Sequence, residues 1–258
     1  MTNKKIIASL TSFPFRITTV HRVIESILNQ TVRLDKIILY LADEQFPEHN
    51  LPGNIIELMR KRPEFEVRWW PHDIKSYKKL VPALIEFPDD LIVTFDDDIL
   101  YPADIVERLI KKHREYPDAI CGCRVKLVTM KNGKIGPYRE WHRYRTMRLL
   151  LTGGYPKLRN MATTGGGTLF PPHSLHPEVI RDDIFMKLCP TTDDLWFWAM
   201  AVLNNTRTVP AGKYIKINMI QETQAEALAN DNLRGKNLND SNTEKILKSY
   251  PTIEFNIV

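Results

Sequence analysis

The sequence predicts an α/β fold in which helices cover a mixed, mostly parallel sheet. Two observations carry this prediction. Strand-like apolar runs alternate with stretches of helical periodicity through the first half of the chain. The apolar run at residues 91–95 then ends abruptly in Asp96, Asp97 and Asp98, as expected of a buried strand that leads into a site. With 258 residues, 43% of them hydrophobic, the chain suits one large domain or one domain with a small appendage.

The first half reads as a series of strand and helix units. Residues 65–70 alternate between apolar and polar side chains, as a strand does, and from Ile17 the apolar positions fall at helical spacing. Pro82 is compatible with a helix only in its first turn. In order, the expected elements are strands at residues 5–10, 36–41, 65–70 and 91–95, and helices from residue 17, at 54–60, at 80–87 and at 103–115.

The second half is less regular. Residues 119–130 read as one long strand, and the Lys-Asn-Gly-Lys sequence at residues 131–134 predicts a tight hairpin turn. A strongly apolar helix is expected to begin at Asp193 and to end near Asn204. We expect residues 1–220 to form the main domain, and the polar, Asn-rich residues 221–258 to add a helical segment or a flap.

The three acids after the fourth strand indicate a ligand site. In sheets of this kind ligands bind beyond the carboxyl ends of the strands. Three adjacent carboxylates repel one another, so a compensating cation is expected, and Mg²⁺ or Mn²⁺ fits because it takes oxygen ligands and is often shared with substrate phosphates. We expect Asp96 and Asp98 to hold it. The alternative is an acidic turn that caps the helix expected near residues 101–104.

Asp193 and Asp194 form a second acidic pair, at the start of the apolar helix. Carboxylates in a first helical turn suit the helix dipole, and Thr192 is a suitable capping residue, so capping alone would explain them. The other interpretation is catalytic: an enzyme that uses one set of carboxylates for a metal needs another to remove a proton.

Two further stretches suggest ligand contacts. Gly165, Gly166 and Gly167 stand in a row, and glycines let a backbone approach a ligand closely. Lys78 and Lys79 lie near an expected helix start, where they could hold a diphosphate, although a solvated basic turn is the simpler alternative.

Composition limits the partners and the location. The formal net charge of +5 and the pI near 9.0 indicate attraction to anions, which include phosphate-bearing substrates, nucleic acid and anionic membrane surfaces. Residues 139–148 mix arginines with aromatic residues, but no nucleic-acid module is recognisable, so no nucleic acid is expected. The three cysteines lack zinc spacing and read as free thiols, and no apolar run reaches the about 20 residues of a membrane span. We expect a cytoplasmic protein, with peripheral contact to the inner membrane face as an option.

The motifs together resemble bacterial nucleotide-sugar glycosyltransferases of the A-type (GT-A) fold, a Rossmann-like mixed sheet. The resemblance is carried by the Asp96-Asp97-Asp98 strand tip, the Thr-Gly-Gly-Gly loop and the helix opening Asp193-Asp194-Leu-Trp, and covers roughly residues 5–205. It is closest to small enzymes that build lipopolysaccharide, lipooligosaccharide or capsule.

The resemblance implies roles for particular residues. Asp96 would contact the donor ribose and Asp98 the Mn²⁺ or Mg²⁺ ion, with Asp97 between them as the variable member. The second acid of the helix pair, Asp194, aligns with the catalytic base, while Asp193 stands where Glu is more usual. Thr11 and Asp73 fall where such enzymes bind the nucleobase and the ribose. We also expect Lys78 and Asp97 to contact the nucleotide, and the three glycines and Trp196 to contact the donor and acceptor. Asn239 and Asp240 are candidates for a third metal ligand.

The activity so implied is transfer of a sugar from a nucleoside-diphosphate donor, expected to be a UDP-sugar, to a hydroxyl of a glycan or glycolipid acceptor, with inversion. Residues 1–115 would form the nucleotide-binding half and residues 116–220 the acceptor half. A nucleotidyltransferase or metal phosphohydrolase is an alternative, although the loop at residues 10–16 contains no glycine for a phosphate cradle. A non-catalytic carbohydrate-binding module is another, but it has no need of two acidic clusters.

Overall fold

The computed structural model describes residues 4–143, 154–212, 215, 218–226 and 238–257. A seven-stranded sheet runs through it in the order β13-β6-β12-β4-β1-β2-β3. Its strands are β1 (Ile6–Thr11), β2 (Lys36–Ala42), β3 (Phe65–Trp70), β4 (Leu91–Thr94), β6 (Ile120–Gly122), β12 (Thr168–Phe170) and β13 (Thr208–Pro210). All neighbouring strands are parallel except β12, which is antiparallel to both β4 and β6. The predicted mixed, mostly parallel α/β sheet is confirmed.

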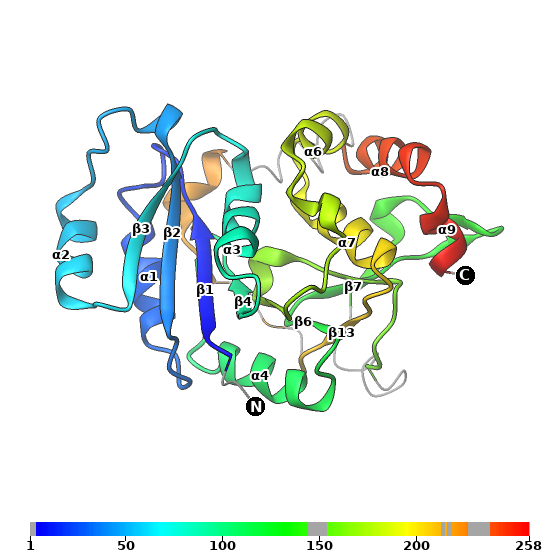
Figure 1. The fold of residues 1–258 in the computed structure, drawn as a ribbon, viewed down its shortest axis with the longest axis horizontal. Helices are drawn as coiled ribbons and strands as arrows, with labels where there is room; N and C mark the ends of the chain where they lie inside the picture. The colour runs from blue at the N-terminus through cyan, green and yellow to red at the C-terminus, as the bar shows by residue number, and fades with distance from the viewer. Residues whose placement is uncertain (1–3, 144–153, 213–214, 216–217, 227–237, 258) are drawn as a thin grey trace.

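Helices cover both faces of this sheet (Figure 1). They are α1 (Val20–Leu28), α2 (Gly53–Lys61), α3 (Val81–Glu86), α4 (Ile105–Glu115), α6 (Asp182–Leu188), α7 (Asp193–Leu203), α8 (Leu238–Ser249) and α9 (Thr252–Ile257). Each element expected over residues 5–115 is present, with ends that differ by at most three residues.

Two apolar layers follow from the alternation of side chains along the strands. On β2, Ile37 and Leu39 belong to the layer under α1, α2 and α4, whereas Ile38 and Tyr40 belong to the layer under α3 and α7. The C-terminal helices α8 and α9 add Ile246, Ile253 and Ile257 to the second layer. Both faces of the central strands are therefore buried, as expected for parallel strands between helices.

The prediction of a single long strand at residues 119–130 is wrong. The chain leaves the main sheet after β6, and β7 (Val125–Leu127) joins a separate antiparallel sheet with β10 (His142–Arg143) and β11 (Asn160–Ala162). Gly122 is closely packed at this point: a Cβ there would lie 2.9 Å from the Cβ of Ala162 on β11 and 3.0 Å from Cγ2 of Val125. Both segments have strand-like sequences, so the break between them is set by their different partners rather than by local composition.

The predicted hairpin at residues 131–134 is confirmed. β8 (Met130–Lys131) pairs with β9 (Lys134–Ile135), and Asn132 and Gly133 both have positive φ angles, as this kind of turn requires. A further short pair joins β5 (Ile99–Leu100) to β14 (Asn218–Met219). Within the described residues, none of the helices combines the length and apolar character of a membrane span.

The antiparallel strand β12 positions the site. Thr168, the first residue of β12, lies opposite Thr94, the last residue of β4. The glycine-rich segment that precedes β12 is therefore held beside the acids that follow β4. A parallel strand would have placed this segment at the opposite edge of the sheet.

Candidate active site

A cavity of about 530 Å³ lies at the edge of the sheet where the parallel strands end. The segments that follow β1, β3, β4 and β6, together with the one that precedes β12, contribute to it. The start of α7 and the small sheet close the other side. The predicted site residues that line it are Thr11, Asp73, Lys78, Asp96, Asp97, Asp98, Gly165, Gly166, Asp193, Asp194 and Asn239. The structure thus brings the strand-tip acids and the acids of α7 into one cavity.

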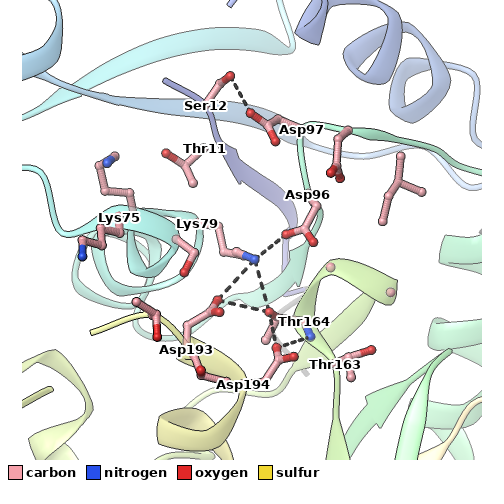
Figure 2. Close-up of a pocket in the computed structure, with 18 of the residues that line it drawn as sticks. Thr11, Ser12, Lys75, Lys79, Asp96, Asp97, Thr163, Thr164, Asp193 and Asp194 are labelled. Carbon is pink, nitrogen blue, oxygen red and sulfur yellow. Dashed lines mark hydrogen bonds and ion pairs between the residues drawn. The ribbon is translucent and has the colours of Figure 1, made fainter. Parts of the chain in front are cut away.

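Lys79 joins the two acidic groups (Figure 2). Its ammonium forms an ion pair with Asp96 after β4 and another with Asp193 at the start of α7, where the nitrogen lies 3.2 Å from Oδ2. It also donates a hydrogen bond of 3.3 Å to Oγ1 of Thr164. The side chain of Lys79 is buried. Burial lowers the pKa of Lys79, but the charges of Asp193, Asp96 and Asp194 outweigh it, so the pKa is raised and the lysine stays charged.

Arg16 neutralises the other strand-tip acids. Its Nη1 lies 2.7 Å from Oδ1 of Asp97 and 3.1 Å from Oδ2 of Asp98, and Ser12 donates a hydrogen bond of 2.6 Å to the second oxygen of Asp97. Burial raises the pKa of Asp97, while Arg16 and Ser12 oppose that effect. Part of the charge that the three acids require is thus supplied by Arg16 and Lys79.

The glycine-rich segment fits closely against the strand tip. A Cβ on Gly165 would overlap the carboxylate of Asp96, so only glycine leaves room for that side chain. Tyr101 fixes the two segments together: its hydroxyl donates to the carbonyl of Gly165 at 2.7 Å and accepts from the N–H of Asp96 at 2.7 Å. Part of the glycine signal in the sequence is therefore explained by packing of the site itself.

Asp194 faces the cavity and is held by Thr164. Its Oδ1 accepts a hydrogen bond of 2.8 Å from the N–H of Thr164 and one of 2.7 Å from the hydroxyl of Thr164. Burial, followed by the negative charge of Asp193, raises the pKa of Asp194 to about 6. In the described part of the chain, Oδ2 of Asp194 takes part in no hydrogen bond. A carboxylate of this kind is suited to accept a proton near neutral pH.

The alternative that these acids only cap helices does not fit the contacts of Asp193 and Asp194, nor those of the acids after β4. Within the residues that the structure covers, neither Asp193 nor Asp194 accepts a hydrogen bond from an N–H of α7, because both side chains bind Thr164 or Lys79 instead. The hydroxyl of Thr192 donates to Asn239 at 3.0 Å and does not cap the helix. The acids after β4 are likewise held by Arg16 and Lys79, as described above.

Three predicted nucleotide contacts line the cavity. The hydroxyl of Thr11 donates to the carbonyl of Tyr40 at 2.8 Å. Asp73 forms an ion pair with the buried Lys78 and accepts a hydrogen bond of 3.0 Å from Gln45. Burial lowers the pKa of Lys78, and the neighbouring Asp73 opposes this. The alternative of a solvated basic turn is wrong for Lys78, whose side chain is buried.

Two predicted residues lie elsewhere. Trp196 is fully buried, donates to the carbonyl of Val179 at 3.2 Å and packs near Phe185, so its ring belongs to the core and not to the cavity. The residues of α7 from Leu195 to Val202 are all buried, which fits their apolar sequence. Trp196 follows the acidic pair closely in sequence, but this does not bring its ring to the cavity. Gly167 has a φ angle of 82° and packs behind the cavity against Ile105. Residues 144–148 of the basic aromatic stretch lie outside the described residues.

The site fits a divalent ion in its chemistry. All three acids line the cavity, but Asp97 has both oxygens engaged by Arg16 and Ser12. Asp96 and Asp98, which pair with Lys79 and Arg16, provide the carboxylate oxygens that Mg²⁺ or Mn²⁺ prefers. Among the described residues there is no group of three or more His, Cys, Asp or Glu side chains arranged to hold a metal. An ion bound by Asp96 and Asp98 would therefore need further oxygens from a substrate diphosphate. Asp240 accepts from the N–H of Tyr138 at 2.6 Å and does not line the cavity.

The sequence reasoning missed several residues of the site. Three of them lie far from the acids in sequence, in segments without a recognisable motif, and they are Arg16, Arg124 and Lys126. Tyr101 follows the acids closely, but no motif marks its hydroxyl as the link to Gly165. A cation that balances the three adjacent carboxylates was expected, and this signal could have directed attention to Arg16 in the loop after the first strand.

Comparison with known proteins bears on the fold. No family model matches the sequence, and no curated protein matches it. Among solved structures, the chain is similar to the mannosyltransferase PcManGT from Pyrobaculum calidifontis in complex with GDP-Man and Mn²⁺, with 12% identity and a TM-score of 0.55, over 87% of this chain and 59% of that one.

Two more solved structures share the fold. One is 4-diphosphocytidyl-2C-methyl-D-erythritol synthase, with 14% identity and a TM-score of 0.51, over 86% of this chain and 97% of that one. The other is S. aureus TarS 1-349 in complex with UDP, with 13% identity and a TM-score of 0.50, over 80% of this chain and 57% of that one. The chain therefore has a GT-A-like fold.

Proposed function

We propose that this protein is a glycosyltransferase that moves a sugar from a nucleoside-diphosphate donor to a hydroxyl group of a glycan or glycolipid acceptor. One observation carries the proposal: the acids after β4 and the acids of α7 share one cavity and are joined by Lys79. An enzyme that holds a diphosphate at one end of its site and removes a proton at the other needs two such groups.

The two parts of the chain that line the cavity support different roles. Thr11, Asp73 and Asp96 come from residues 1–115 and would contact the nucleotide of the donor. Asp194 comes from residues 116–220 and would contact the acceptor. The segment at residues 221–258 contributes Asn239 to the lining, which supports a part for it in covering the site.

In the proposed reaction Asp194 is the general base. Its Oδ2 takes the proton of an acceptor hydroxyl while Thr164 holds Oδ1. The acceptor oxygen forms a bond to the anomeric carbon of the donor sugar, and the bond from that carbon to the diphosphate oxygen breaks, so the nucleoside diphosphate leaves with the electron pair. A single displacement of this kind inverts the anomeric centre.

Charge must be balanced where the diphosphate departs. Lys79 and Arg16 hold Asp96, Asp97 and Asp98 in place and offset their negative charge, which would otherwise repel the donor. Mn²⁺ or Mg²⁺ bound by Asp96 and Asp98 would supply Lewis-acid stabilisation of the leaving group. The Mn²⁺ that accompanies GDP-Man in the structurally similar mannosyltransferase supports this choice of ion.

The acceptor that we propose is a growing lipopolysaccharide, lipooligosaccharide or capsule chain. The net charge of +5 supports peripheral contact with an anionic membrane surface on its cytoplasmic side, where such chains would be built. We propose a UDP-sugar as the donor, and the UDP complex of the similar TarS structure supports a uridine nucleotide.

The test is the product released from a panel of sugar nucleotides, in the presence of Mn²⁺ and a mixture of bacterial glycan acceptors. The proposal predicts a nucleoside diphosphate. Pyrophosphate formation or consumption would instead indicate a nucleotidyltransferase, the alternative that the fold shared with 4-diphosphocytidyl-2C-methyl-D-erythritol synthase keeps open. Binding without any product would indicate a carbohydrate-binding module.

A further inference from the structure

Three basic side chains line the second-half side of the cavity and have no part in the transfer described above. Arg124 lies just before β7, Lys126 lies on β7 and Arg143 lies on β10. The two strands pair so that Arg143 is directly opposite Lys126. We call Arg124, Lys126 and Arg143 the basic wall. Like charges at directly opposed positions destabilise a sheet, so this pairing needs an explanation.

Arg124 is seated by the glycine-rich segment. A Cβ on Gly166 would lie 2.6 Å from the Cβ and 2.7 Å from the Cγ of Arg124, so the stem of the arginine packs directly on Gly166. These are atoms near the backbone that have little freedom to move. Gly166 therefore does for Arg124 what Gly165 does for Asp96, and the position of Arg124 at the cavity is built into the loop.

Lys126 is held in a partly desolvated place. Its ammonium lies 3.6 Å from the centre of the Tyr138 ring. Burial lowers the pKa of Lys126 to about 8, an effect that the charge of Asp194 opposes. Among the described residues no carboxylate forms an ion pair with Lys126 or Arg143. The paired acids of the cavity bind Arg16, Lys78 and Lys79 instead, and they are Asp73, Asp96, Asp97, Asp98 and Asp193. An anion from a ligand would restore the balance.

The position of the basic wall indicates which ligand this is. Burial raises the pKa of Tyr138 and the charge of Asp194 adds to that effect, while the same charge opposes the lowering of the pKa of Lys126 by burial. Lys126 and Tyr138 touch each other, so both lie on the side of the cavity where Asp194 acts. The helix that carries Asp194, α7, packs on β11, which pairs with β7, and in Figure 1 β7 and α7 are drawn in the half of the molecule away from β1 to β3. Because a general base must touch the hydroxyl that it deprotonates, groups beside it meet neighbouring parts of the acceptor.

We propose that the basic wall binds a carboxylate or phosphate group of the acceptor, so that the protein transfers its sugar to an acidic or phosphorylated sugar. This inference rests on the proposed function. Arginine matches the geometry of both groups with paired hydrogen bonds, and a lysine beside it adds a point charge. A neutral acceptor would leave Lys126 and Arg143 without a carboxylate or phosphate partner among the described residues.

The test uses simple anions and a protein that is saturated with UDP, which occupies the place of the donor nucleotide. D-glucuronate and methyl phosphate, with D-glucose as the neutral control, are titrated and their binding is followed by NMR. We expect both anions to bind the UDP complex and glucose to bind more weakly. The variants Lys126→Met and Arg143→Gln should each weaken anion binding by about tenfold or more, the usual worth of a charge-assisted hydrogen bond.

Lys134→Met is the matched control, since Lys134 is exposed on β9, outside the cavity, and its loss removes the same charge. It should leave anion binding unchanged. The proposal is overturned if UDP displaces the anions, which would assign the basic wall to the donor diphosphate, or if the two cavity variants bind anions as the wild type does. Failure of the proposed function would look different: no sugar nucleotide would yield a nucleoside diphosphate, whereas anion binding would still depend on Lys126.

Discussion

Lys79 and Asp193 form a buried ion pair across the site, with the lysine nitrogen 3.2 Å from Oδ2 of the aspartate. The lysine belongs to the segment after β3 and the aspartate to the start of α7, so this contact ties the two halves of the cavity together. The same ammonium binds Asp96. A single buried cation thus sets the distance between the strand-tip acids and the acids of the helix.

Removal of this cation should be costly. Lys79→Met would leave Asp96 and Asp193 without their shared partner, and breaking a buried ion pair lowers the free energy of unfolding by about 3–5 kcal/mol. Urea unfolding of the variant measures the loss. Lys111→Met, at an exposed position of α4, is the control and should change stability by only about 0.5 kcal/mol. Equal stability of the two variants would show that the bridge is not structural.

Gly165→Ala should disturb the site at its strand tip. The added methyl group would overlap the carboxylate of Asp96, and overpacking of this kind costs about 1–3 kcal/mol of stability. Because Asp96 must move, we also expect weaker nucleotide binding. Gly53→Ala at the start of α2 is the control, since a Cβ there meets nothing within 4 Å. Thermal unfolding and nucleotide titration of both variants test this. If Gly165→Ala has the stability and the nucleotide affinity of the wild type, glycine is not needed at this position to make room for Asp96.

Transfer should depend on pH through Asp194. Burial and Asp193 raise the pKa of this carboxyl to about 6, and a general base works only when it is deprotonated. The rate should therefore fall as the pH drops through about 6 and level off at higher pH. Asp193→Asn removes the neighbouring charge and should move the midpoint to lower pH. The measurement is kcat/KM as a function of pH, and a profile that is flat across this region would exclude Asp194 as the base.

The contribution of a metal ion can be tested separately. Asp98→Asn should reduce the gain in nucleotide affinity that Mn²⁺ produces, because an amide oxygen carries no charge to attract the ion. Calorimetric titration of UDP and GDP with and without Mn²⁺ measures that gain. Asp118→Asn, at an exposed position after α4, should leave it intact. If Mn²⁺ enhances binding to the Asp98 variant as strongly as to the wild type, Asp98 is not a ligand.

Local sequence patterns predicted most of the first half of the fold. The strand at residues 91–95 was evident because its apolar run is short and bounded by acids, and the helix that buries Val20 and Ile24 follows its periodicity. The break between β6 and β7 was not predictable in this way, because it depends on pairing with β10, β11, β12 and β13, which all come later in the chain.

The acidic residues of the site could also be identified from the sequence, but their partners could not. Asp97 and Asp194 stand in recognisable clusters, whereas Arg16 reaches Asp97 across a separation of 81 residues and carries no motif of its own. Trp196 shows the opposite case, in which a residue next to a motif is part of the core. Contacts between distant segments decide these points, and a single sequence does not reveal them.

The most direct test of the account compares donor binding with transfer in Asp194→Asn. The account places the donor at the strand tip and the base on α7, so this variant should bind the sugar nucleotide with unchanged affinity and lose transfer by a factor of about 10²–10⁴. Isothermal titration gives the affinity, and release of nucleoside diphosphate gives the rate. Transfer at the wild-type rate, or loss of donor binding together with transfer, would contradict the assignment of Asp194 as the base.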